Sequence, residues 1–417
     1  MSKEERSSME MPRFQKIGLE KLGAEWHGWL RERYYAAFGV PAPTVEMDSR
    51  QWAASRPGLG QWIEVSPPRA EIISPRKIEG AVDELSPHLK SQSLDRRHRY
   101  LEEIHPVGEY HFDSEYVVSI ERGRVVGRTV AVITPDNCNL TDVGKIQFKS
   151  QGPHGRWNYR GGLPQPMRFR GKLGVLSYSV CGMNFFHFLV ECLPKLRLFE
   201  EAGIEIDQFY APYQHRYAKQ LLELFGVGSE QVIPEAAGRH LLPDQLVACS
   251  PISFPRREAR QFLFERMAQQ PWSQVASGKR KRIYISRAKA GWRKVLNEDQ
   301  VMAMLARHGF QRYFLEDLNV REQIQLFQQA EMIVGPHGAG LANIVFTPPG
   351  AKVIEIGTVY RPFGYFHRLC TQCDHDMVWF LGQAVQGTRK EESHIVVDVA
   401  QLEGCLAQQP SRYLVAA

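Results

Sequence analysis

The spacing of apolar and polar residues divides the chain into stretches of different character. Between residues 110 and 140, short alternating runs at 116–120 and 125–133 are broken by glycines, which predicts a β meander or hairpin. From residue 173 onward, short apolar runs alternate with segments of helical spacing. Such alternation is typical of βα units, so we predict an α/β protein with parallel strands.

The βα pattern comprises two series of elements. The first predicts strands at 173–178, 206–211 and 246–249 and helices at 184–202, 217–225 and 257–269. The second predicts strands at 282–286, 311–315, 332–334, 353–356 and 377–381 and helices at 298–308 and 321–330. Two such series, joined around residues 250–280, predict two Rossmann-like domains that face each other across a cleft, the usual place for a ligand.

The length of 417 residues exceeds a usual single core, which supports more than one domain. We predict an accessory segment over 1–95, helical over 13–38 and then extended and proline-rich. The two Rossmann-like domains are predicted over 96–255 and 256–417.

Composition narrows the class of protein. The net charge of +6 is too small to indicate nucleic-acid binding by itself. The seven cysteines are scattered and odd in number, so we expect reduced, buried thiols. Residues 1–18 contain no apolar signal region, and no stretch approaches the roughly 20 apolar residues of a membrane span. We therefore expect a cytoplasmic protein that binds no nucleic acid.

Residues 331–356 are predicted to form a strand, a glycine-rich turn, a short helix and a second strand. Gly335, Gly338 and Gly340 would let a ligand approach the backbone N–H groups at the start of the helix, which suits a diphosphate. A tight turn without a ligand would use glycines equally well. His337 favours the ligand, because a large polar ring has no packing reason to lie among glycines at the carboxyl edge of a sheet.

Positive charge is concentrated between residues 279 and 294, which contain eight Lys and Arg and no acid. A solvated face is one interpretation, and a nucleic-acid platform is another, although the interleaved aromatic residues of such a platform are few. The run 282–287 is instead typical of a buried strand that ends with Ser286 and Arg287 in the cleft. We expect a site for a phosphorylated small molecule.

A third group of polar residues lies on the helix predicted over 184–202. His187 and Glu191 are four residues apart and share one face, with Asn184 one turn earlier. An imidazole oriented by a carboxylate is a common general base near neutral pH. The apolar neighbours exclude a solvated stripe, which leaves a buried polar cluster and a catalytic pair as alternatives.

No metal site is predicted. The His-Glu-x-x-His pattern is absent, and Cys370 and Cys373 have no second pair with which to bind zinc. Asp374 and Asp376 resemble an Asp-x-Asp metal motif but precede a predicted strand, which places them at the wrong end of the sheet.

These blocks in their order resemble the family 61 glycosyltransferases, whose bacterial members are often called capsular polysaccharide biosynthesis proteins. The resemblance covers residues 110–385 and rests on Asn184, His187, Glu191, Ile285-Ser286-Arg287, Arg293, Asn297-Glu298 and the run 335–343. It implies a GT-B fold, a nucleotide-sugar donor that is commonly a UDP-sugar, an inverting reaction, and neither metal nor other cofactor. This chain departs from the family at Phe188 and Glu191, where Trp and Asp are frequent.

The resemblance also implies roles for the candidate residues. Domain 96–255 would bind the acceptor and hold the catalytic group of His187, Glu191 and Asn184, in which His187 or Glu191 is the base. Domain 256–417 would bind the donor diphosphate through Arg287, Arg293, His337, Gly338, Ala339, Gly340 and Leu341, and the nucleoside or sugar through Ser286, Asn343 and Glu355. The acceptor would be an oligosaccharide, polysaccharide or glycolipid of surface polysaccharide biosynthesis. Peripheral association with the inner face of the membrane stays open, as does the oligomeric state.

Two other classes remain as alternatives. A non-catalytic nucleotide- or sugar-binding protein would keep the glycine-rich turn but would not need the His187–Glu191 pair. A nucleotide-dependent oxidoreductase would also have two Rossmann-like domains, but its Gly-x-Gly-x-x-Gly pattern followed by an acid is absent.

Two further patterns predict helix starts. Asn297 with Gln300, and Asn319 with Glu322, have the spacing of a capping box ahead of helical apolar residues. Capping therefore explains Asn297 without a ligand.

Overall fold

The computed structural model describes most of the chain between residues 37 and 407. The described residues are 37, 39–73, 77–84, 90–91, 108–128, 130–144, 162–178, 181–182, 184–252, 256–278, 280–361, 364–385 and 390–407. The helix predicted over 13–38 lies outside them apart from residue 37. The chain divides into two compact units, one of 1–62, 118–179 and 235–248 and one of 63–117, 180–234 and 249–417. The predicted boundaries after residues 95 and 255 stay predictions.

The first unit contains the predicted meander. Strands β7 (Arg124–Val126), β8 (Ala131–Ile133) and β9 (Cys138–Leu140) are antiparallel neighbours. β13 (His240–Cys249) pairs antiparallel with β7, β10 (Met167–Val175) pairs parallel with β13, and β1 (Val45–Met47) pairs parallel with β9. The helix α2 (Ser49–Ser55) interrupts the stretch that was predicted to be extended. It begins after Asp48, whose carboxylate accepts hydrogen bonds from the first backbone N–H groups of the helix.

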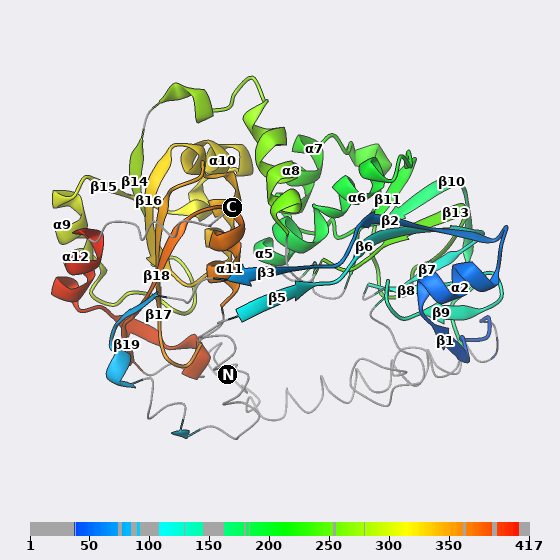
Figure 1. The fold of residues 1–417 in the computed structure, drawn as a ribbon, viewed down its shortest axis with the longest axis horizontal. Coiled ribbons are helices and arrows are strands. Elements are labelled where there is room, and N and C mark those ends of the chain that lie inside the picture. Colours follow the sequence, from blue (N-terminus) through cyan, green and yellow to red (C-terminus); the bar gives the residue numbers. More distant parts are fainter. Residues whose placement is uncertain are drawn as a thin grey trace, which may run out of the picture. The chain divides into compact units, whose positions relative to one another are not determined.

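The second unit contains a six-stranded parallel sheet (Figure 1). Its strands, in spatial order, are β15 (Phe310–Tyr313), β14 (Lys281–Ile285), β16 (Ala330–Pro336), β17 (Lys352–Gly357), β18 (Asp376–Leu381) and β4 (Lys77–Gly80). Every pairing along it is parallel. The α/β class is therefore confirmed, and β4 is an edge strand that the sequence did not predict.

Helices pack on both faces of this sheet. α9 (Glu298–Arg307) and α12 (Val399–Ala407) form one core with Tyr284, Val334 and Ile354. These three residues are paired neighbours on β14, β16 and β17, so their side chains share one face of the sheet. Figure 1 shows α10 (Val320–Gln328) and α11 (Tyr365–Gln372) on the other side. Because strand residues alternate between faces, Glu355 lies on the side of α10 and α11.

The strand order creates a switch point in the sheet. β15 lies on one side of β14 and β16 on the other, so the order of the strands reverses between β14 and β16. Ligands of open α/β sheets bind at the carboxyl ends of such strands. Ser286 and Arg287 follow β14, and His337 and Gly338 follow β16. The fold thus brings two of the predicted groups together at the expected edge.

The first βα series supplies β11 (Gln208–Ala211), α7 (Arg216–Leu224) and α8 (Arg257–Ala268) of the second unit. The sequence did not predict β12 (Val232–Pro234), which pairs parallel with β11. The helix predicted over 184–202 is divided into α5 (Phe185–His187), a π-helical turn η3 (Phe188–Cys192) and α6 (Lys195–Glu201). Pro194 has no backbone N–H to continue an α-helix and is the N-cap of α6, which explains the division.

Two strands near the end of the chain, β19 (Gln383–Val385) and β20 (His394–Val396), pair antiparallel, and four more strands lie between residues 60 and 121. They are β2 (Gly60–Ser66), β3 (Arg69–Ile73), β5 (Gly108–Phe112) and β6 (Glu115–Glu121), of which β3 and β5 pair antiparallel.

All seven cysteines are buried and free, as predicted. None of the described helices is long and apolar enough to cross a membrane.

The two predicted capping boxes have different outcomes. Asn319 and Glu322 form one at the start of α10, as predicted. Asn297 is the N-cap of α9, as predicted, but the predicted capping bond is wrong, because its side chain makes no cap bond. Its amide instead pairs with the backbone of Val397, donating at 2.8 Å and accepting at 3.0 Å. A long-range hydrogen bond therefore replaces the local motif.

Candidate active site

His187 is the last residue of α5, and its Nδ1 lies 2.8 Å from Oε1 of Glu191. The two side chains keep 23% and 13% of their surface exposed, so the pair is neither a solvated stripe nor a sealed core. In the part of the chain that the structure describes, Nε2 of His187 has no hydrogen-bond partner. An imidazole with one nitrogen on a carboxylate and the other open can act as a general base.

The local backbone explains how this pair is presented. Asn184 is the N-cap of α5, and its side chain accepts a hydrogen bond from the backbone N–H of His187 at 3.2 Å. Glu191 lies in the π-helical turn, in which Leu193 N donates to Phe188 O at 2.9 Å. Such turns are frequent at functional sites. The geometry gives Asn184 a capping role, and its catalytic role stays a prediction.

Arg287 and Arg293 lie in the loop after β14 and are half-buried. Burial lowers the pKa of both guanidinium groups, and that of Arg293 falls to about 9 because Arg287 and Arg361 are also close. The Nε atoms of Arg287 and Arg293 are buried and have no hydrogen-bond partner among the residues with assigned positions. Guanidinium groups that repel one another and have a buried, unsatisfied Nε indicate a binding site for an anion.

The glycine-rich turn leads into a 3-10 helix, η7 (Ala339–Phe346), with Gly338 as its N-cap. Gly338 has extended backbone, so its role is to leave space. A Cβ there would lie 2.2 Å from Nη1 of Arg287, and a Cβ on Gly340 would lie 2.6 Å from Leu315. The space that Gly338 leaves is thus occupied by the side chain of Arg287, which is itself predicted to bind the phosphate.

The backbone amides of the turn divide into two groups. The N–H of Leu341 donates to the carbonyl of Gly338 at 3.0 Å, so it makes the first bond of the helix. The N–H groups of Ala339 and Gly340 precede that bond and have no acceptor within the helix. Both residues are partly exposed, so these two amides are better placed for an anion than that of Leu341.

His337 is buried, and both of its ring nitrogens have partners. Nδ1 is bonded to Oε1 of Glu355, and Nε2 lies 3.0 Å from Nε of Arg361. Because a guanidinium can only donate, Nε2 accepts, and Nδ1 carries the proton that Glu355 accepts. Burial lowers the pKa of His337 against the effect of Glu355, and Arg361 and Arg293 lower it further, which favours this neutral form. The predicted hydrogen bond from His337 to a diphosphate would need another tautomer.

Three residues predicted to contact the nucleoside or sugar are bonded within the protein. The hydroxyl of Ser286 lies 2.8 Å from Glu298 Oε1. Asn343 is fully buried and donates to the carbonyl of Gly340 at 3.0 Å, while Glu355 is fully buried against His337. Here they hold the loop and the turn in shape, and their contact with a donor stays a prediction.

Aromatic rings connect the His187 pair with the turn. Phe186 packs edge-to-face on Phe366 of α11, with 5.5 Å between ring centroids. Phe366 packs in turn on His337, with 5.3 Å between centroids. α5 also contacts η7 directly. The predicted base and the predicted diphosphate site therefore lie on adjacent elements of the second unit.

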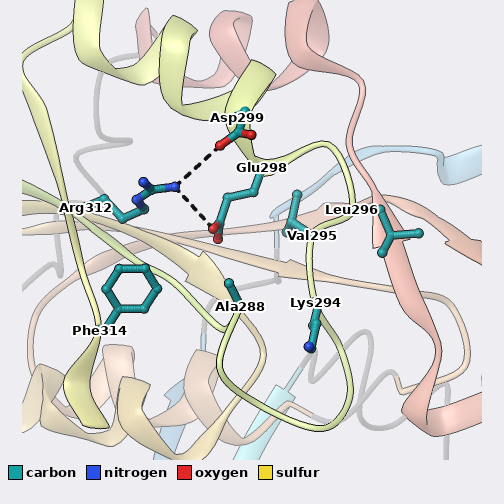
Figure 2. Close-up of a pocket in the computed structure, with 8 residues that line it drawn as sticks. All are labelled: Ala288, Lys294, Val295, Leu296, Glu298, Asp299, Arg312 and Phe314. Carbon is teal, nitrogen blue, oxygen red and sulfur yellow. Dashed lines mark ion pairs between the residues drawn. The ribbon is translucent and has the colours of Figure 1, made fainter. Parts of the chain in front are cut away.

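A pocket of about 350 Å³ adjoins the loop that carries Arg287 (Figure 2). Its lining residues are Ala288, Lys294, Val295, Leu296, Glu298, Asp299, Arg312 and Phe314. Arg312 Nη1 lies 3.6 Å from both Glu298 and Asp299, and Glu298 accepts a hydrogen bond from the buried hydroxyl of Tyr284 at 2.9 Å. The pocket thus combines an apolar wall with fixed charges.

The sequence analysis missed Arg361 and assigned no role to Glu298. Arg361 lies four residues beyond the end of β17, at the same sheet edge as Arg287 and His337. The signal that could have identified it was this position, because all carboxyl ends of parallel strands meet at one edge.

The structure shows no metal-binding arrangement at the motifs that the sequence analysis considered, within the described residues. Among the described residues, no group of three or more His, Cys, Asp and Glu side chains could hold a metal ion. Asp374 lies before β18, at the amino edge as expected, and pairs with Arg257.

Comparison with known proteins identifies a family domain within the chain. Residues 185–354 match the model of the family Glycosyltransferase 61. Over 85 residues the chain is 33% identical to the EGF domain-specific O-linked N-acetylglucosamine transferase of Drosophila melanogaster, which covers 20% of this chain and 16% of that protein. Over 45 residues it is 42% identical to a Beta-1,2-xylosyltransferase of Oryza sativa subsp. japonica, which covers 11% of this chain and 8% of that protein.

The alignments thus span less than a fifth of either relative. The family match includes His187, Glu191, Arg287, Arg293 and His337, whereas Asn184, Glu355 and Arg361 lie just beyond its ends. Residues 185–354 of this chain are a glycosyltransferase 61 domain, as the sequence resemblance predicted.

Proposed function

We propose that this chain is an inverting, metal-independent glycosyltransferase that moves a sugar from a nucleotide-sugar, first of all a UDP-sugar, to a glycan acceptor. One observation carries the proposal. The buried Nε atoms of Arg287 and Arg293 have no hydrogen-bond partner among the described residues, and they lie in the loop at the switch point, where Arg287 meets the glycine turn. The adjacent α5 supplies His187 and Glu191 as base and orienting group.

The leaving nucleoside diphosphate gains negative charge as its bond to the sugar breaks. Arg287 and Arg293 offer forked donors to phosphate oxygens, and the N–H groups of Ala339 and Gly340 can add two more. Such donors are preorganised, so they stabilise the charge without rearrangement. A bound anion would also offset the burial and the repulsion that lower the pKa of Arg293.

His187 would accept the proton of the attacking hydroxyl at Nε2. Glu191 would hold Nδ1–H and stabilise the imidazolium that forms. The new bond joins the acceptor oxygen to the anomeric carbon while the bond from that carbon to the phosphate oxygen breaks. This single displacement inverts the anomeric configuration.

The finer parts of the proposal follow from this chemistry. The pocket beside Arg287 is of a size for the nucleoside of the donor, with Phe314 and Leu296 as apolar walls. We further propose a GT-B arrangement, an oligosaccharide, polysaccharide or glycolipid acceptor, and a cytoplasmic role in surface polysaccharide biosynthesis.

The test is a nucleotide and donor screen. Thermal shifts with UDP, GDP, CMP and NAD, each with and without EDTA, identify the bound nucleotide, and hydrolysis of a panel of nucleotide sugars identifies the donor. We expect stabilisation by one nucleoside diphosphate that persists in EDTA, and slow release of sugar from its conjugates. Stabilisation by NAD alone would indicate an oxidoreductase. Nucleotide binding without release or transfer of any sugar would indicate a non-catalytic binding protein.

A further inference from the structure

Arg361 and His337 form a connected unit next to the proposed diphosphate site. Nε of Arg361 donates to Nε2 of His337 at 3.0 Å, and His337 in turn is fixed by the fully buried Glu355. His337 directly precedes Gly338, against which Arg287 lies. Arg361 is therefore linked by two contacts to the turn that holds Arg287.

We infer that Arg361 is a third diphosphate-binding group and that His337 is a positioning residue that acts through Arg361. The inference rests on the proposed function and extends it to two residues. Glu355 fixes the proton of His337 on Nδ1, so Nε2 presents a lone pair to Nε of Arg361. In this arrangement the Nη1 and Nη2 groups of the planar guanidinium do not bond the imidazole and would be the donors to the diphosphate.

The charges around Arg361 support a ligand at this place. Arg361 is close enough to lower the pKa of both Arg287 and Arg293. The carboxylates that act on these groups are Glu355, which is engaged by His337, and Glu316 and Glu392 near the surface. Three guanidinium groups that act on one another at this sheet edge are suited to a multiply charged anion.

Fixing the side chain of Arg361 before binding favours affinity, because a free arginine side chain has several rotatable bonds. Ordering it on binding costs rotamer entropy, and a fixed Nε removes part of that cost from the binding step. His337 also packs against Phe366, so the imidazole that fixes Arg361 is itself held in place.

A double-mutant cycle distinguishes this role from direct contact. The variants are Arg361→Gln, His337→Phe, the double variant, and His337→Gln, whose amide can still accept from Arg361 and donate to Glu355. Binding of UDP and of inorganic pyrophosphate in EDTA is measured by calorimetry, with circular dichroism to verify folding. Arg307→Gln, an exposed arginine on α9, is the matched control, and Arg287→Gln is the positive control.

We expect Arg361→Gln and His337→Phe each to weaken both ligands roughly 10- to 100-fold, and the double variant to be no weaker than the worse single variant. His337→Gln should recover most of the affinity and keeps the test valid if His337→Phe does not fold. Additive losses, or unchanged binding in Arg361→Gln, would overturn the inference while leaving the proposed function intact. Failure of the unmodified protein to bind any nucleoside diphosphate would overturn both.

Discussion

Two histidine–glutamate pairs of the candidate site, His187–Glu191 and His337–Glu355, have different surroundings. In each, Nδ1 is bonded to a carboxylate. The side chains of His187 and Glu191 are 23% and 13% exposed, whereas those of His337 and Glu355 are 8% and 0% exposed. Nε2 of His337 accepts from Arg361, and that of His187 is bonded to no other described group.

The difference lies in what the second nitrogen meets. An open Nε2 can take a proton from a substrate, because protonation costs no hydrogen bond that the protein already makes. An Nε2 that accepts from an arginine must lose that bond on protonation and would place a second positive charge beside it. The same two residue types therefore form a proton acceptor on α5 and a fixed support after β16.

The largest expected effect is a loss of transfer activity when the histidine of the His187–Glu191 pair is removed. His187→Ala should lower the transfer rate by about 10²- to 10⁴-fold, the usual contribution of a general base, and leave the affinity for the nucleoside diphosphate unchanged. Initial rates with the donor from the screen, together with calorimetric titration of UDP, provide the measurement.

His308 is the matched control for this substitution. It pairs with Glu403 at the surface, with Nε2 2.7 Å from Oε1, so His308→Ala removes a similar pair elsewhere. Transfer that persists in His187→Ala would show that another group is the base.

The second effect separates the pairs by stability. Glu355→Ala leaves the buried Nδ1–H of His337 without its acceptor, and we expect a loss of about 3 kcal/mol in the free energy of unfolding. Glu191→Ala breaks a pair that water can partly reach, and we expect about 1 kcal/mol together with a marked loss of transfer. Urea unfolding of both variants tests this order, and equal losses of stability would remove the distinction between the pairs.

Acid should weaken the fold through its buried histidines. Burial lowers the pKa of His337, and it lowers that of His240 and His375 to about 4. The unfolded chain binds these protons at about pH 6.5, so stability is full above that pH and is lost by a few kcal/mol as the pH falls toward 4.

Unfolding midpoints between pH 8 and 5 provide the measurement, because carboxylates with lowered pKa, such as Asp136, titrate below this range. Glu235 acts in the opposite direction, since burial raises its pKa, and Glu235→Gln removes that offset. Constant stability from pH 8 to 5 in Glu235→Gln would show that these histidines are accessible to protons in the folded state.

Local patterns were sufficient to predict most elements around the site. The strands after residue 280 are short apolar runs bounded by polar turns, and their carboxyl ends identify the edge where Arg287 and His337 lie. The Asn184–His187–Glu191 spacing likewise predicted one helical face, because that contact depends only on helix geometry.

Contacts between distant residues could not be predicted in this way. Nothing near β4 indicates that residues 77–80 pair with β18, some three hundred positions later. The bond of Asn297 to Val397 overrode a local capping motif for the same reason. The tautomer of His337 depends on Arg361, which approaches it only in the folded sheet.

The smallest expected effect concerns the residue that starts the first pair. If Asn184 only caps α5, Asn184→Ala should cost about 1 kcal/mol of stability, and Asn184→Ser should recover it, because a serine side chain also accepts from the backbone N–H of His187. Transfer by Asn184→Ser would then equal that of the unmodified protein. A rate that stays low in Asn184→Ser while stability is restored would show that the amide acts on the substrate. The His187–Glu191 pair would then have a third catalytic member, which the His337–Glu355 pair lacks.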